Sequence, residues 1–304
     1  MASLPKYFVL RGSSAFTSHT TSEGGRTFEK SIKIKGYDSP ITIVSLDPLE
    51  TPLRCMWSIP SKNLSVLKSN LQKCVRRGLV SKAVKSAYAI WCISPMELLR
   101  RLPIIIVEDT LPFPGLITLT WYMMAVSKGY VLSSDEVSWI LGVVYTITEN
   151  IKTTQKVYQT YEVEEESKNP IQRDLVWSMI FRRSYGGMKG DVEMLKRLEG
   201  YWSSKESPSL EVEPIDLDSL GSYKKSMYIT AAIDQHCFSF IPKKIRELHP
   251  DLSVEEIASV IWKCRSSVNF RNPRDVSDRN LNTWTIIQED LEKLSQWVID
   301  KLVL

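Results

Sequence analysis

The chain has 304 residues, and its 39 lysine and arginine residues outnumber its 35 aspartate and glutamate residues, which gives a formal net charge of +4. Hydrophobic residues make up 43% of the chain and charged residues 24%, values near the averages of globular proteins, and these exclude disorder across the whole chain. The most apolar stretch, residues 102–119, contains Glu108, Asp109 and three prolines, so it lacks the run of about 18 apolar residues that a membrane helix needs. The composition predicts a mildly basic globular protein of one or two domains with no membrane span.

The cysteines and histidines give no metal-site pattern. The five cysteines are scattered without a CxxC pair, and the three histidines are not spaced with them as zinc ligands. A chain of this length can also fold without disulfides, so we expect free thiols in a reducing intracellular compartment, nuclear or cytoplasmic. The first 28 residues are rich in Ser, Thr and Arg with Glu23 as the single acid, which keeps an organelle as an alternative. No metal and no cofactor is predicted.

Residues 1–60 predict a short β arm or hairpin. Strand-like segments run through Tyr7-Phe-Val-Leu and through Ile41-Thr-Ile-Val, and a loop rich in Ser, Thr and Gly follows the first of them. Pro48, Pro52 and Pro60 mark the end of this segment.

From Ser61 the apolar spacing becomes helical. One face of the first expected helix, which ends near Gly78, carries Leu64, Leu67, Leu71, Cys74 and Val75. Further helices are expected over 80–91, from Pro95, and over 135–161 behind a Ser-Asp-Glu cap. The β-branched run over 102–109 fits a buried strand or a buried helix, and its helical neighbours favour the helix.

A polar run over 162–169, with four glutamates, separates this first lobe from a second lobe over 170–304. The spacing in the second lobe predicts helices over 171–184, 191–198, 223–237, 253–264 and 284–304, with 203–221 as a long loop or lid. The predicted fold is therefore mainly α, with two helical lobes at 61–161 and 170–304 and the β arm at 1–60.

Four ordered segments of the first lobe carry a resemblance to a known family. They are Leu71-Gln-Lys-Cys-Val-Arg-Arg-Gly, Lys82-Ala-Val-Lys-Ser-Ala-Tyr-Ala-Ile-Trp, Pro95-Met-Glu-Leu-Leu-Arg-Arg-Leu and Ile104-Ile-Ile-Val-Glu-Asp. Residues 64–161 resemble the helical C-terminal domain of the RarA/MgsA/WRNIP-type AAA+ ATPases, clamp-loader relatives that act at stalled replication forks. The resemblance implies an oligomerising, DNA-proximal collar.

The chain also departs from that family. It contains no Gly-x-x-x-x-Gly-Lys-Ser/Thr phosphate loop, and the segment before Ser61 is too short and too β-like to form an AAA+ module. ATP hydrolysis by the AAA+ mechanism is therefore not expected.

A cationic segment runs through the first lobe. Seven basic residues and no acidic residue lie between Ser61 and Lys85. Such a segment attracts phosphates with an affinity that falls as salt rises, while a solvated helix face or a surface for an acidic protein partner is the alternative. The predicted nucleic-acid contacts are Lys73, Arg76, Arg77, Lys82, Lys85, Arg100 and Arg101.

A glycine-rich turn in the second lobe, residues 182–191, offers a second anion site. Its glycines allow close backbone approach, and a helix N-terminus follows at Asp191. The candidate anion ligands are Arg182, Arg183, Gly186, Gly187 and Lys189. The simpler interpretation is a turn that joins two helices.

Asp234, His236 and Arg265 could supply a base, an acid and an oxyanion clamp to a nuclease or phosphotransferase-like enzyme. The neighbouring Cys237 would need a base from elsewhere to act as a nucleophile. A capped helix with a satisfied histidine and buried cysteines is the structural alternative.

These patterns predict a non-catalytic, nucleic-acid-associated accessory protein of DNA replication or repair. Its expected ligand is DNA, with RNA as the alternative, and the resemblance favours a homo-oligomer or a subunit of a larger complex. The enzyme above and a structural subunit of a nucleoprotein or virion-like assembly, docked through the N-terminal arm, are the other two hypotheses.

Overall fold

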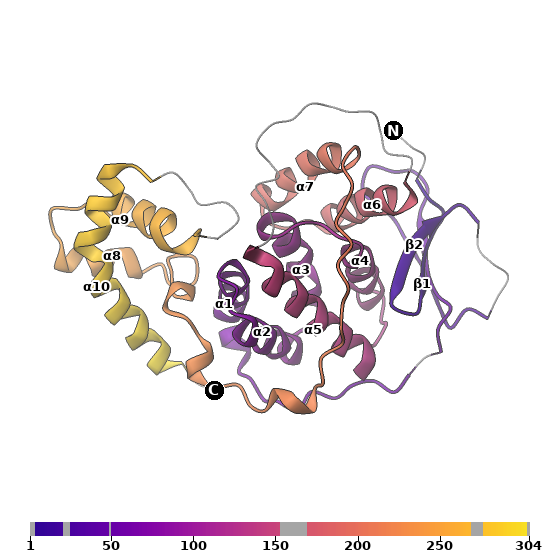
Figure 1. Cartoon of the computed structure of the whole chain (residues 1–304), viewed down its shortest axis with the longest axis horizontal. Coiled ribbons are helices and arrows are strands. Elements are labelled where there is room, and N and C mark those ends of the chain that lie inside the picture. The colour runs from indigo at the N-terminus through magenta and orange to yellow at the C-terminus, as the bar shows by residue number, and fades with distance from the viewer. Residues whose placement is uncertain (1–3, 21–24, 49, 153–168, 269–275, 303–304) are drawn as a thin grey trace. The chain divides into compact units, whose positions relative to one another are not determined.

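A computed structural model describes residues 4–20, 25–48, 50–152, 169–268 and 276–302, and these are mainly α-helical with one small sheet (Figure 1). The strands are β1 (Tyr7–Arg11), β2 (Ser14–Ser18), β3 (Phe28–Ile32) and β4 (Ile41–Ser45). The α-helices are α1 (Leu64–Arg76), α2 (Val80–Ile93), α3 (Pro95–Asp109), α4 (Gly115–Val126), α5 (Ser134–Glu149), α6 (Pro170–Ser184), α7 (Lys189–Trp202), α8 (Ile241–Leu248), α9 (Val254–Ile261) and α10 (Asp278–Lys301). The predicted mainly α class is confirmed.

The chain divides into two compact units that do not follow the predicted boundaries at residues 60 and 161. Unit 1 comprises 1–54, 95–146 and 157–217, and unit 2 comprises 55–94, 147–156 and 218–304. Unit 1 therefore combines the predicted β arm with parts of both predicted lobes. The expected helix over 135–161 is present as α5 up to Glu149, and its last part, with most of the expected polar break, lies outside the described residues.

The N-terminal strands form a sheet of order β2-β1-β4-β3 in place of the predicted arm. The β1–β2 and β3–β4 pairs are antiparallel, while β1 and β4 pair in parallel, with Tyr7 opposite Thr42. Helices α4 and α6 pack against this sheet (Figure 1). Two side-chain hydrogen bonds fix the packing: Trp121 Nε1 donates to the Phe8 carbonyl at 3.0 Å, and the Thr17 hydroxyl donates to the buried Asp174 carboxylate at 2.5 Å. The sheet is thus part of the core of unit 1.

Two helices of unit 1 depend on details of the sequence. The run over 102–109 continues α3 as predicted, with Pro103 inside the helix, where it cannot donate a hydrogen bond to the Leu99 carbonyl. In α5, Gly142 lies directly against the backbone carbonyl of Glu213, so a Cβ at this position would overlap that carbonyl. A glycine is therefore required where the 211–215 segment crosses α5.

Unit 2 contains the α1–α2 pair and the C-terminal helices α8, α9 and α10. The predicted helix over 223–237 is wrong, because this segment forms two short 3-10 turns, Lys225–Met227 and Thr230–Ala232. Asn70 of α1 holds it in that form: its side-chain amide donates to the Met227 carbonyl at 3.1 Å and accepts from the Ile229 N–H at 2.9 Å. These bonds satisfy backbone groups that a helix would have paired internally.

Cys55 and Cys92 form a disulfide, which corrects the expectation of five free thiols. The bond joins the extended segment before α1 to the end of α2 within unit 2. No spacing pattern indicated this pair, whose two cysteines lie 37 residues apart. The remaining cysteines are free, and the predicted reducing compartment has no support from this pattern.

Cys74 is expected to resist alkylation in the folded protein. Its side chain is fully buried, and burial raises the pKa of the thiol to about 12, so the reactive thiolate is scarce at mildly alkaline pH. N-ethylmaleimide labelling followed by peptide mass spectrometry should modify the partly exposed Cys264 first and Cys74 only at the rate of unfolding. Equal labelling rates in native buffer would contradict this burial.

Within the described residues, no helix combines the length and the apolar character that a membrane span requires.

Candidate functional site

The predicted cationic segment forms the α1–α2 pair of unit 2. Neither helix contains an acidic residue, but their basic side chains differ in how far they are exposed. Lys73 and Arg76 are each only 4% exposed. Lys68, Lys82 and Lys85 are partly exposed. The surface of the pair therefore presents only part of the predicted phosphate-binding set.

Lys73 forms a buried ion pair with Asp234, which is 2% exposed. The Lys73 ammonium also donates to the Ser69 hydroxyl at 3.0 Å. Burial lowers the pKa of Lys73, although the negative charge of Asp234 acts in the opposite direction. Burial alone would raise the pKa of Asp234, but the charge and hydrogen bond of Lys73 outweigh that effect and hold this pKa below its ordinary value. The two side chains are thus partners of each other inside unit 2.

The two arginines at the end of α1 are also bonded inside unit 2. The Arg76 guanidinium donates to the Ser266 carbonyl at 2.9 Å. The Arg77 guanidinium donates to the Arg265 carbonyl and, at 3.1 Å, to the Lys73 carbonyl. A phosphate would have to displace these partners. We therefore no longer expect phosphate contacts from three of the predicted residues, Lys73, Arg76 and Arg77.

Arg100 and Arg101 lie in α3, in unit 1. The Arg100 guanidinium donates to the Tyr185 carbonyl at 3.2 Å, and Arg101 lies 3.7 Å from the Asp191 carboxylate. These contacts attach α3 to the α6–α7 turn. Both arginines act there as structural contacts between helices.

The α6–α7 turn contains the predicted anion ligands, and they bind groups of the protein. Arg182, 4% exposed, donates to the Arg100 carbonyl at 2.8 Å and to the Gly186 carbonyl at 2.7 Å, and burial lowers its pKa to about 10. Arg183 forms a bidentate pair with Glu199 at 2.7 and 3.1 Å. Gly186 and Gly187 adopt φ values of 71° and 142°, which close the turn. This arrangement agrees with the simpler interpretation, a turn between two helices.

Lys189, the remaining predicted anion ligand, begins α7 and is exposed. Its ammonium lies 3.8 Å from the Glu193 carboxylate, one helical turn away. Lys189 is thus at the surface, whereas Arg182 is buried.

The residues of the alternative enzyme site come together in unit 2. His236 Nδ1 lies 3.4 Å from the Asp234 carboxylate, and Arg265 donates to the Ile233 carbonyl at 2.6 Å. Arg265 also contacts Glu292 at 3.2 Å and the Ser295 hydroxyl at 3.1 Å. A carboxylate already neutralised by Lys73 is a weak base, and an arginine bonded to these groups is not directed at a ligand.

Cys237 is a poor nucleophile in this setting. Burial, together with the charge of Asp234, raises the pKa of its thiol, so the thiolate is disfavoured. Its Sγ instead contacts the Ser65 carbonyl at 3.5 Å. The polar cluster around Asp234 thus joins α1 to the C-terminal helices and has the chemistry of a structural network.

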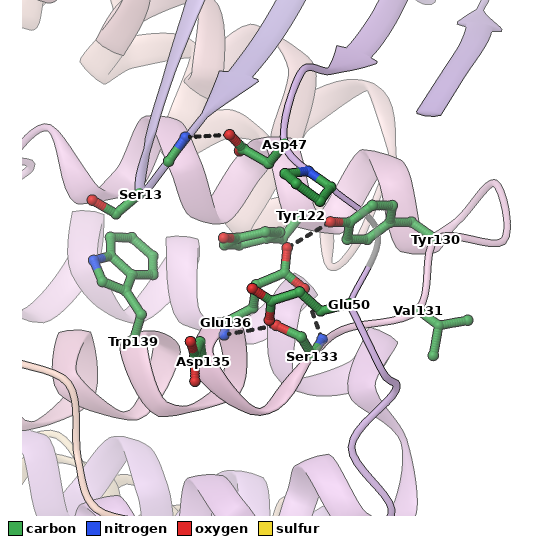
Figure 2. Close-up of a pocket in the computed structure, with 12 residues that line it drawn as sticks. Ser13, Asp47, Glu50, Tyr122, Tyr130, Val131, Ser133, Asp135, Glu136 and Trp139 are labelled. Atoms are coloured by element: carbon green, nitrogen blue, oxygen red, sulfur yellow. Dashed lines mark hydrogen bonds between the residues drawn. The ribbon is translucent and has the colours of Figure 1, made fainter. Parts of the chain in front are cut away.

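Unit 1 contains a pocket of about 210 Å³ that the sequence did not indicate (Figure 2). It is assembled from the β1–β2 turn, the segment after β4, helix α4 and the start of α5. Its charged lining residues are the carboxylates Asp47, Glu50, Asp135 and Glu136, and its aromatic lining residues are Tyr122, Tyr130 and Trp139. Of the features that line this pocket, the sequence predicted only the Ser-Asp-Glu cap of α5.

Glu136 is the best-fixed carboxylate of this pocket. It accepts hydrogen bonds from the Tyr130 hydroxyl at 2.7 Å and from the Ser133 N–H at 2.8 Å (Figure 2). Ser133 Oγ in turn accepts from the Glu136 N–H at 3.3 Å, which completes a capping box one residue earlier than predicted. Burial raises the pKa of Glu136, and its hydrogen bonds oppose that effect.

Among the described residues, no group of three or more histidine, cysteine, aspartate or glutamate side chains is arranged to hold a metal ion. No protein-family model matches this chain, and no curated protein and no solved structure shows significant similarity to it.

Proposed function

We propose that this protein is a non-catalytic, nucleic-acid-associated accessory protein that binds the sugar–phosphate backbone through the partly exposed lysines of the α1–α2 pair. The observation that carries the proposal is the charge of this segment: no acidic residue lies between Ser61 and Lys85, and four of the five lysines there remain at least partly exposed, namely Lys62, Lys68, Lys82 and Lys85. Lys82 and Lys85 lie one turn apart on α2 and are partly exposed. Lysines on helices that contain no carboxylates attract phosphates by charge alone, independent of base sequence.

The role in DNA replication or repair is part of the same proposal. It rests on the resemblance of residues 64–161 to the clamp-loader-like collar, which also suggests an oligomer. DNA is the preferred ligand on that ground, and RNA offers the same phosphate chemistry.

Replacing Lys82 and Lys85 with alanine is expected to weaken binding about equally for every nucleic-acid sequence. Each lost phosphate contact should reduce the slope of log affinity against log salt by about one, hence by about two for the double variant. Fluorescence anisotropy with short single- and double-stranded DNA and RNA, at a low and a moderate salt concentration, measures both quantities.

The matched control is Lys33→Ala/Lys35→Ala, which removes two exposed lysines from unit 1 and causes the same change in net charge. It should bind like the wild-type protein. If both double variants lost the same affinity for nucleic acid, the loss would be an effect of net charge, and the binding site would not be assigned to α2. A wild-type protein that binds none of the probes at low salt would overturn the proposed function itself.

A further inference from the structure

We infer that the pocket of unit 1 accepts an organic cation, namely an alkylammonium or guanidinium group held between aromatic rings and carboxylates (Figure 2). This inference is independent of nucleic-acid binding, which concerns the opposite charge and the other unit.

The charge of the lining excludes an anionic ligand. Four carboxylates line the pocket and no lysine, arginine or histidine does. In the part of the chain that the structure describes, none of these four carboxylates forms an ion pair with a basic side chain. Their negative charge is therefore left without an internal counter-charge, and a cation entering the pocket would supply it.

The aromatic walls are built and held by the core. Tyr122 is 2% exposed and Trp139 is 8% exposed, and their ring centroids lie 6.1 Å apart. The Tyr122 hydroxyl points into the pocket toward Trp139, while Tyr130 is held at the opposite side by Glu136 (Figure 2). Aromatic rings next to carboxylates form the kind of cage that binds ammonium groups, because the negative ring faces attract the cation.

The geometry favours an organic cation over a metal ion. A hard metal ion requires several oxygen ligands at one point, and the described carboxylates are not gathered in that way. The volume of about 210 Å³ is below that of pockets for drug-sized ligands, which begin at about 300 Å³, so it suits the end of one basic side chain or a small amine.

The positions of the four carboxylates decide which of them can be tested. Asp47 accepts the Gly12 N–H at 2.9 Å and Glu136 caps α5, so replacing either would disturb the fold. Glu50 and Asp135 are exposed at the pocket. These two can lose their charge with little structural cost.

Isothermal titration calorimetry with the full chain tests the inference directly. The probes are choline, butylammonium and N-acetyl-lysine methylamide, with 3,3-dimethylbutanol as the neutral match for choline. Saturable one-site binding of the cations, and none of the neutral alcohol, is expected. A lysine probe that binds more tightly than butylammonium identifies a peptide side chain as the source of the cation, and the reverse order identifies a free amine.

The variants separate the two parts of the cage. Trp139→Leu and the double variant Glu50→Gln/Asp135→Asn should each weaken cation binding about tenfold, as expected for the loss of an aromatic face or of two charges near the cation. The control Glu206→Gln/Glu211→Gln removes two exposed acids elsewhere in unit 1 and should leave binding unchanged. Binding of the neutral alcohol as tightly as the cations, or no saturable binding of any cation at millimolar concentration, would overturn the inference.

Discussion

The Asp234→Asn variant is expected to lose about 3–5 kcal/mol of unfolding free energy, which is the usual cost of removing one partner from a buried ion pair. The substitution leaves the Lys73 ammonium with 5% of its side chain exposed and no counter-charge at its partner position. Urea unfolding followed by circular dichroism measures the loss. An unchanged slope of unfolding free energy against urea concentration would show that the unfolded state is the same. A loss below about 1 kcal/mol would show that the pair is solvated in solution.

Two further measurements separate the charge effect from simple packing. The double variant Lys73→Met/Asp234→Leu removes both charges and should recover part of the stability, because no charge is then buried alone. The control Glu247→Gln breaks the exposed Lys244–Glu247 pair and should change stability by less than about 0.5 kcal/mol.

The stabilisation by Asp234 should also depend on pH. Its pKa is lowered in the folded protein, so its contribution is fully present above the unfolded-state pKa and is lost as the pH falls through the folded-state pKa. The difference between the wild-type protein and Asp234→Asn is therefore expected to shrink as the solution is acidified.

Local signals in the sequence were enough to predict much of the helical structure. The spacing of Leu64, Leu67 and Leu71 predicts α1, and Pro95 correctly marks the first residue of α3. Ser253 caps α9 as expected, since its hydroxyl accepts from the Glu256 N–H at 3.1 Å. In each case the determinant lies within one or two turns of the element that it defines.

The errors concern contacts between distant parts of the chain. The parallel β1–β4 pair, the Asn70 bonds that replace a helix over 223–237, and the Lys73–Asp234 pair all join residues that no local pattern connects. Lys73 and Asp234 are 161 residues apart, so the sequence shows a basic segment without showing which of its charges are neutralised. The pocket of unit 1 was missed for the same reason, because it is assembled from several separate segments.

Removing the disulfide with Cys55→Ser/Cys92→Ser is expected to lower the unfolding free energy by about 4 kcal/mol. The bond closes a loop of 37 residues, and a closed loop of that length reduces the entropy of the unfolded chain by roughly this amount. Denaturant unfolding of the variant, and of the wild-type protein with and without a reducing agent, measures the change. The reduced wild-type protein should match the variant, while the single substitution Cys264→Ser, at a partly exposed free cysteine, should change stability by less than about 1 kcal/mol.

A thiol count decides whether the bond forms at all. The chain has five cysteines, and three of them are free in the structure. Titration with Ellman's reagent in denaturant, without a reducing agent, should therefore detect three thiols in the purified protein and five after reduction. Five thiols before reduction, with no effect of reducing agent on unfolding, would restore the expectation of a chain that keeps every cysteine reduced. Three thiols would instead direct attention to oxidising environments, because a disulfide in a folded protein persists where thiols are not kept reduced.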